Sequence, residues 1–108
     1  MIATRTPWFM LHSPEIGRAF QDFSRICNED GVLGRKTKAL LMLAAASLMQ
    51  RREGIEDRLH RAVEAGVSKA EITETLLVMA LLIAESHLSQ ADNLYRQYLG
   101  NSNDRSSR

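Results

Sequence analysis

Residues 36–72 read KTKALLMLAAASLMQRREGIEDRLHRAVEAGVSKAEI, and this stretch decides the fold of the chain. Its first part is apolar on nearly every face of a helix between Ala39 and Met49, which is typical of a central, buried helix. The small residues from Ala44 to Ser47 in this run allow another helix to approach closely. We therefore predict a buried helix over residues 35–51.

The second part of the stretch predicts two further helices joined by a tight turn. Residues 52–65 carry mixed charges and are followed by Gly66, the residue type that most often ends a helix. Ser68 and Glu71 have the S-x-x-E spacing of a capping box, in which each residue satisfies a free backbone N–H at a helix start. A second strongly apolar helix is predicted from Lys69 to Ile83.

The flanking segments complete the predicted organisation. Residues 1–12 show no periodicity and are predicted to form an extended N-terminal arm, whose aromatic residues cover the core or a neighbouring subunit. Ser13-Pro14 is a helix start, with serine as the N-cap and proline at the first helical position. It is followed by one apolar stripe, made of Ile16, Phe20, Phe23 and Cys27.

A last helix is predicted to end at Gly100. The polar segment Glu85-Ser86-His87 either interrupts the preceding helix or marks its exposed end. Residues 101–108 are polar and without periodicity, so we expect a disordered tail. The predicted domain organisation is an arm over 1–12, a helical domain over 13–100 and a tail over 101–108.

Composition narrows the class of protein. The chain has 108 residues, with 14 Lys and Arg against 13 Asp and Glu. This balance predicts no nucleic-acid partner, because nucleic-acid surfaces show a clustered basic excess. The single cysteine, Cys27, fits a reducing compartment. The longest apolar run is too short to span a bilayer and no secretory signal opens the chain, so a cytoplasmic protein without a membrane partner is predicted.

Two helices that are apolar on most faces are difficult to bury in so short a chain. A small domain has too much surface for its volume to cover both of them. The surplus apolar surface predicts association with other subunits.

The layout resembles the carboxymuconolactone decarboxylase and alkylhydroperoxidase D (AhpD-like) family over roughly residues 14–98. The resemblance rests on K-T-K-A-L-L at 36–41 and A-x-x-A-G-V-S-K-A-E-I at 62–72. It implies an all-α, AhpD-like bundle of about five to six helices that assembles into a homo-oligomer, a trimer or a hexamer. Pockets are then expected between helices near the subunit contact. An unrelated four-helix bundle is the nearest rival fold.

In that family the same frame carries C-x-x-C-x-x-x-H before the A-x-x-A-G turn, and here the cysteines are absent. One register anchors on Gly66 and places the family's two cysteines at Arg51 and Gly54 and its histidine at Arg58. This register needs no gap and is preferred. The sequence therefore excludes peroxide reduction by a cysteine pair.

A second register shortens the turn by two residues. Glu53, Glu56 and His60 then reproduce the family spacing, with glutamates in place of cysteines. Both registers stay open at this point, because the decarboxylase branch also lacks the cysteine pair and keeps acid and histidine groups there.

Helix geometry relates these residues to the predicted core. At about 100° per residue, the core-facing stripe is expected to contain Ile55, Leu59, Ala62, Val63 and Gly66. Arg51 and Arg58 lie at one edge of this stripe, whereas Glu53, Glu56 and His60 lie on the other flank and turn toward solvent.

Each register predicts its own site. In the first, Arg51 and Arg58 bind a small anionic ligand such as a carboxylate, although arginines at such positions more often extend along the core and pair with acids. In the second, His60 is a general acid or base oriented by Glu56, although an ordinary solvated helix face has the same pattern. His87 could complete either site from the facing helix.

Three functions follow as hypotheses. The first is a lyase-like enzyme that uses acid-base chemistry on a small carboxylated or lactone-like molecule, with His60, Glu56 and His87 as catalytic residues. The second is a small-molecule binder that uses Arg51 and Arg58, and the third is an oligomeric scaffold. We predict no cofactor and no metal, since three ligands from one helix, such as Glu53, Glu56 and His60, rarely complete a tetrahedral site.

Overall fold

The computed structural model describes residues 8–100, and every regular element within them is helical. The order is α1 (Trp8–His12), α2 (Pro14–Asn28), α3 (Arg35–Met49), α4 (Arg52–Glu64) and α5 (Lys69–Tyr95), followed by a π-helical turn, η2 (Arg96–Gly100). The predicted all-α fold is confirmed. The predictions for residues 1–7 and 101–108 fall outside the described residues. The chain divides into two compact units, residues 1–76 and 77–108.

Residues 8–12 were predicted to be extended and instead form α1, a short helix that packs against α2. The contact depends on Gly17, which is buried, because a Cβ at this position would come within 3.3 Å of Met10. Trp8 is 72% exposed within this chain, and its predicted contact with the core or with a neighbouring subunit stays a prediction. The close approach of α1 to Gly17 is a tertiary contact, and the periodicity of the sequence does not predict such contacts.

The start of α2 agrees with the sequence. Ser13 has an extended backbone and its Oγ accepts a hydrogen bond from the Ile16 backbone N–H at 3.3 Å, with Pro14 as the first helical residue. The predicted apolar stripe of α2 is largely uncovered, since Ile16 and Phe23 are 57% and 62% exposed. These apolar residues lie on one helix as predicted, but few other side chains of the described residues pack against them.

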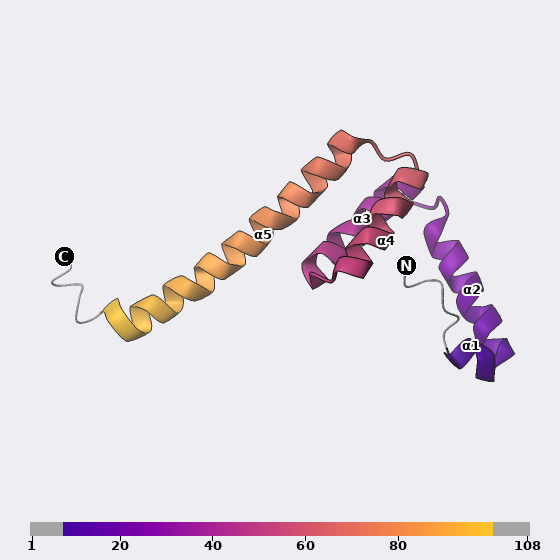
Figure 1. Cartoon of the computed structure of the whole chain (residues 1–108), viewed down its shortest axis with the longest axis horizontal. Coiled ribbons are helices and arrows are strands. Elements are labelled where there is room, and N and C mark those ends of the chain that lie inside the picture. Colours follow the sequence, from indigo (N-terminus) through magenta and orange to yellow (C-terminus); the bar gives the residue numbers. More distant parts are fainter. Residues whose placement is uncertain (1–7, 101–108) are drawn as a thin grey trace. The chain divides into compact units, whose positions relative to one another are not determined.

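The centre of the first unit is the pair formed by α3 and α4, which lie side by side (Figure 1). Helix α3 ends at Met49, two residues earlier than predicted, because Gln50 adopts a left-handed conformation with φ of 56°. The buried apolar side chains among the described residues are Leu43, Ala62 and Val67. This is a small core, so most of the apolar surface that the sequence contains remains outside it.

The buried face of helix α4 overlaps the predicted stripe but does not coincide with it. Ala62 of the predicted stripe is fully buried, and Ile55 and Leu59 of the same stripe are half-buried. Val63, also expected there, is instead 63% exposed, and Asp57, outside the stripe, is buried with 4% exposure. Arg58, expected at the edge of the stripe, is half-buried. At about 100° per residue, the buried face is rotated by roughly 60° toward Arg58. The helix and part of its buried face were predicted correctly, but the angle of that face about the helix axis was not.

The turn after α4 is a Schellman motif. Gly66 has φ of +86°, its N–H donates to the Val63 carbonyl at 3.0 Å, and the Val67 N–H donates to the Ala62 carbonyl at 3.0 Å. These two bonds satisfy carbonyls that the helix end leaves free. Gly66 was predicted to end the helix, and the structure agrees.

The capping box that begins α5 is formed in both directions. The Ser68 N–H donates to Glu71 Oε1 at 2.8 Å, and the Glu71 N–H donates to Ser68 Oγ at 3.1 Å. The hydrogen bond from the Ser68 backbone, followed by that from its side chain and by the charge of Lys36, lowers the pKa of Glu71 below its ordinary value of 4.5. The carboxylate form of Glu71 therefore caps the helix at neutral pH.

Helix α5 continues through Glu85-Ser86-His87 without interruption and contains no buried residue. Among the described residues, Lys69–Gly100 is the one helix that is long and apolar enough to cross a bilayer, judged by length and composition alone. Large apolar side chains remain exposed along it, including Leu77, Val78, Leu81, Leu82, Leu88 and Leu94.

Candidate functional site

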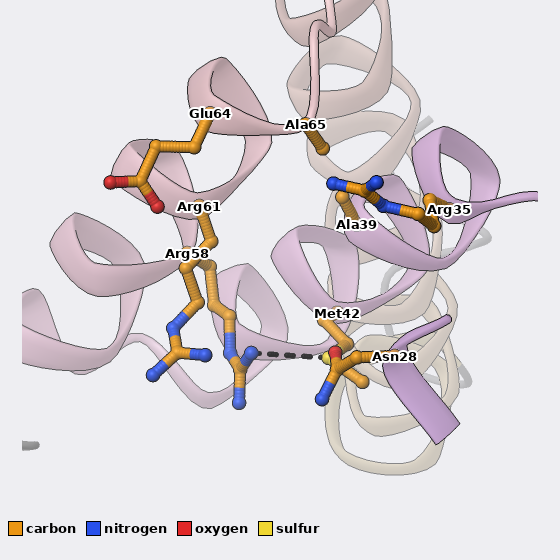
Figure 2. Close-up of a pocket in the computed structure, with 8 residues that line it drawn as sticks. All are labelled: Asn28, Arg35, Ala39, Met42, Arg58, Arg61, Glu64 and Ala65. Atoms are coloured by element: carbon orange, nitrogen blue, oxygen red, sulfur yellow. Dashed lines mark hydrogen bonds between the residues drawn. The ribbon is translucent and has the colours of Figure 1, made fainter. Parts of the chain in front are cut away.

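A cavity of about 240 Å³ lies in the first unit, where the end of α2 meets α3 and α4 (Figure 2). Its walls combine cationic side chains with small or apolar ones. They are Asn28 from the end of α2, Arg35, Ala39 and Met42 from α3, and Arg58, Arg61, Glu64 and Ala65 from the α4 segment. The lining contains three arginines and one glutamate, so it carries an excess of positive charge.

The helices place these residues through their spacing. Arg58, Arg61 and Ala65 recur at intervals of three and four residues, which puts them on one face of the α4 segment. Arg35, Ala39 and Met42 recur in the same way on α3. The small side chains of Ala39 on α3 and Ala65 after α4 leave space between the two helices. The longer arginine, methionine and glutamate side chains form the rest of the cavity wall.

Arg58 is partly buried, but the hydrogen bond that its guanidinium makes is a weak one. Its Nη1 donates to the Met42 Sδ at 3.1 Å, the contact drawn as a dashed line in Figure 2. A thioether is a weak acceptor. Within residues 8–100, no carboxylate forms an ion pair with Arg58. Its remaining N–H donors are therefore free to bind an anion.

Arg35 is the second arginine in the cavity lining that forms no ion pair with a carboxylate among the described residues. Its backbone N–H, but not its guanidinium, is bonded to Asp30 Oδ1 at 2.7 Å. Figure 2 shows Arg35 approaching the cavity from α3 while Arg58 approaches from α4. The two free guanidinium groups thus belong to different walls of the cavity.

Arg61 is held by a residue that the sequence analysis did not identify. Its Nε donates to Asp57 Oδ2 at 3.0 Å, and the Asp57 side chain is 4% exposed. The other carboxylate oxygen, Oδ1, is buried and has no hydrogen-bond partner among the described residues. The i, i+4 spacing of Asp57 and Arg61 could have suggested the pair, but Asp57 lies outside the predicted core stripe, so its burial was not predicted.

The structure separates the predicted site residues. Arg58 lines the cavity, whereas Arg51 is the exposed N-cap residue of α4 and does not line it. The predicted convergence of Arg51 and Arg58 is therefore not present at this cavity. Because Arg51 precedes the first helical turn, the helical spacing used to pair it with Arg58 does not apply to it.

The residues of the second register lie elsewhere. Glu56 lines an open hollow of about 520 Å³ between the end of α3 and the start of α4, with Ser47, Gln50, Arg52, Ile55 and Leu59. His60 is exposed and lines neither hollow. His87 is exposed and belongs to the second unit. Within residues 8–100, no three His, Cys, Asp or Glu side chains are grouped so that they could hold a metal ion.

The family model of the carboxymuconolactone decarboxylase family matches residues 14–95, from the start of α2 to the end of α5. The chain belongs to the carboxymuconolactone decarboxylase family. The family assignment expected from the A-x-x-A-G turn and the helix layout is thereby confirmed. The whole cavity lies within the matched segment.

A solved structure has the same fold. It is the crystal structure of a protein from Methanobacterium thermoautotrophicum, which superposes with a TM-score of 0.65 and is 26% identical. The similarity covers 82% of the present chain and 99% of the archaeal one. A comparison with curated proteins finds no match.

Proposed function

We propose that this member of the carboxymuconolactone decarboxylase family binds a small carboxylated molecule in the cavity between α2, α3 and α4. The observation that carries the proposal is Arg58, a half-buried guanidinium whose recorded contact is a thioether. Partial removal of a cation from water is unfavourable without an anionic partner, and a ligand carboxylate would supply that partner.

The opposite wall supports the same ligand class. A ligand with two anionic groups could contact Arg58 with one group and Arg35 with the other, while its carbon skeleton lies against Ala39 and Met42. Arginine suits this role because its planar fork binds carboxylates through two parallel hydrogen bonds. The cavity volume of about 240 Å³ lies below the usual range for drug-sized ligands, roughly 300–1,000 Å³, and so favours a small ligand.

Binding is favoured over acid-base catalysis by the positions of the titratable groups. A general base must reach its substrate within about 3 Å or through one water. His60 does not line the cavity, and Glu56 lines the other hollow. Glu64 is the one carboxylate in the lining, so an acid-base mechanism would have to use this residue in place of the predicted histidine.

We also propose that the protein assembles from several copies, as the surplus of apolar residues predicts. Helix α5 supports this proposal, because none of its residues is buried and many of its large apolar side chains, such as Leu77, Leu81 and Leu88, are more than half exposed. Exposed apolar surface of this extent usually marks an interaction site.

The test of the binding function is isothermal titration calorimetry with muconate, a small dicarboxylate. The wild-type protein is compared with Arg58→Gln and with Arg51→Gln as the matched control. Loss of a hydrogen bond to a charged group costs about 1.5–3 kcal/mol. Arg58→Gln is therefore expected to weaken binding roughly ten- to a hundredfold, whereas Arg51→Gln should bind like the wild type.

Two results would contradict the proposal. One is the absence of muconate binding to the wild-type protein at millimolar concentration. The other is equal affinity of the Arg58→Gln and Arg51→Gln proteins, which would place the ligand outside this cavity.

A further inference from the structure

We propose that Asp57 is a positioning residue for this site: it fixes the Arg61 guanidinium at the cavity wall so that the terminal nitrogens of Arg61 bind the anionic ligand. This inference rests on the proposed binding function. It adds a second anion-binding group on α4 and a buried acid that orients it, and neither residue was a site candidate in the sequence analysis.

The first observation is the burial of Asp57. It is the one charged residue that is buried among the described residues, with an exposed fraction of 4%. Moving a carboxylate out of water is unfavourable unless it is paired and hydrogen-bonded. Here the pairing is incomplete, because Oδ2 accepts from Arg61 Nε at 3.0 Å while Oδ1 has no partner in the described part of the chain.

Only the Asp57 partner of this ion pair is buried, and an ion pair whose buried carboxylate is incompletely hydrogen-bonded stabilises a fold poorly. Replacement of such a pair by apolar residues is often neutral or stabilising, so its presence indicates a role other than stability. Asp57 contacts Arg61, and Arg61 lines the cavity. The arrangement therefore connects the buried acid to the ligand site through one hydrogen bond.

The geometry of that bond leaves Arg61 competent to bind. Asp57 is bonded to Nε, so the recorded contact uses none of the four N–H groups on the two terminal nitrogens. The Arg61 side chain is 44% exposed, which leaves it accessible to a ligand. With its inner nitrogen fixed, the guanidinium loses less side-chain freedom when a ligand binds, and such preorganisation favours affinity.

A second pair in the chain provides a natural comparison. Asp92 and Arg96 have the same i, i+4 spacing and the same Nε contact at 3.0 Å. Their side chains are 56% and 75% exposed. Exposed pairs of this kind contribute little, so Asp92 serves as the matched control for Asp57.

Two effects of Asp57→Asn have opposite signs, which makes the inference testable. Removal of the negative charge makes the surroundings of the cavity more positive, and this alone would strengthen the binding of an anion. Loss of the charge-assisted bond to Arg61 would instead release the guanidinium and weaken binding. If Asp57 acts by positioning, the affinity falls even though a repulsive charge has been removed.

The experiment is a double-mutant cycle read by muconate titration. It uses the wild-type protein, Asp57→Asn, Arg61→Gln and the combined variant, with Asp92→Asn as the control. We expect Asp57→Asn to weaken binding about tenfold, and we expect the combined variant to bind no more weakly than Arg61→Gln alone. Asp92→Asn should leave the affinity unchanged. Circular dichroism verifies that each variant is folded.

Other outcomes overturn the inference. Binding by Asp57→Asn that is as tight as in the wild type, or tighter, shows that the charge and not the position of Arg61 matters. Multiplicative losses for Asp57→Asn and Arg61→Gln show that Asp57 acts on the fold in general. If Asp57→Asn does not fold, Arg61→Lys provides the test. A positioned guanidinium predicts that Arg61→Lys loses nearly as much muconate affinity as Arg61→Gln. Wild-type affinity of Arg61→Lys contradicts the inference.

The failure of the inference can be distinguished from the failure of the binding function. If the wild-type protein binds muconate and Arg58→Gln does not, the function stands whatever Asp57 does. If the wild-type protein does not bind, both fall together.

Discussion

A pair of identical substitutions, Leu43→Ala and Leu81→Ala, tests whether the apolar surface of α5 is covered in solution. Leu43 in α3 is fully buried, whereas Leu81 in α5 is 57% exposed. Both changes remove the same atoms, so the difference between them reports the environment of each side chain.

The expected magnitudes follow from these exposures. Truncation of a buried leucine costs about 2–5 kcal/mol, and Leu43→Ala should fall in this range. Full burial of a leucine side chain contributes about 1.5–3 kcal/mol. Because less than half of Leu81 is removed from water within a single chain, Leu81→Ala should cost only about 1 kcal/mol if the protein is a monomer. If a second copy covers α5, its cost should approach that of Leu43→Ala.

The assay is equilibrium unfolding in urea at two protein concentrations that differ about a hundredfold. Unfolding of an obligate oligomer depends on protein concentration, because dissociation is part of the reaction. The expected result is a large cost for Leu81→Ala together with a midpoint that rises with concentration.

Two results would refute this reasoning. A cost near 1 kcal/mol with a concentration-independent midpoint means that Leu81 stays in contact with water. A large cost with a concentration-independent midpoint means that the same chain covers Leu81, and the proposed assembly is then wrong on this helix.

Two further predictions concern the turn between α4 and α5. Gly66→Ala should destabilise the fold by about 1–2 kcal/mol, because alanine is strained in the left-handed region, although no atom lies within 4 Å of the added Cβ. Gly54→Ala is the control: it also meets no atom within 4 Å but lies inside α4, so it should be stabilising by about 0.5–1 kcal/mol in the same thermal or urea unfolding experiment. Because the folded-state pKa of Glu71 is lowered, its carboxylate contributes stability that is fully present above pH 4.5 and is lost as the pH falls through the lowered value. Unfolding curves measured from pH 6 downward should therefore show a smaller loss for Glu71→Gln than for the wild type, and an identical loss would contradict the role of the carboxylate.

Three helix boundaries could be read from the sequence, because they depend on residues within one helical turn. Ser13 caps α2 through Ile16, three residues later. Ser68 and Glu71 cap each other over the same distance. Gly66 ends α4 because this position requires a positive φ, which glycine adopts without strain. These interactions close within a single helical turn, so the residues themselves specify them.

The candidate site could be predicted only in part. Arg58 was placed at the edge of the core stripe, and the structure brings it to the cavity. Arg51 was paired with it by helical spacing, but α4 begins at Arg52, and that spacing does not apply. The first register thus pointed to one residue of the cavity, while Arg35 and Arg61 were not selected because neither matches a position of the family motif.

The sequence alone determined the start of α2, the glycine that ends α4 and the start of α5, but it did not predict α1 or the uninterrupted course of α5 to Tyr95. It also excluded a cysteine-pair reaction, because it contains one cysteine. The tertiary structure decided which face of α4 meets α3, and with it the burial of Asp57 and the half-burial of Arg58. The physical reason is that helix periodicity defines a stripe only to within a broad arc, and packing between two particular helices selects the angle within it. A rotation of roughly 60° about the helix axis preserves every backbone hydrogen bond of α4 but changes which side chains face the cavity.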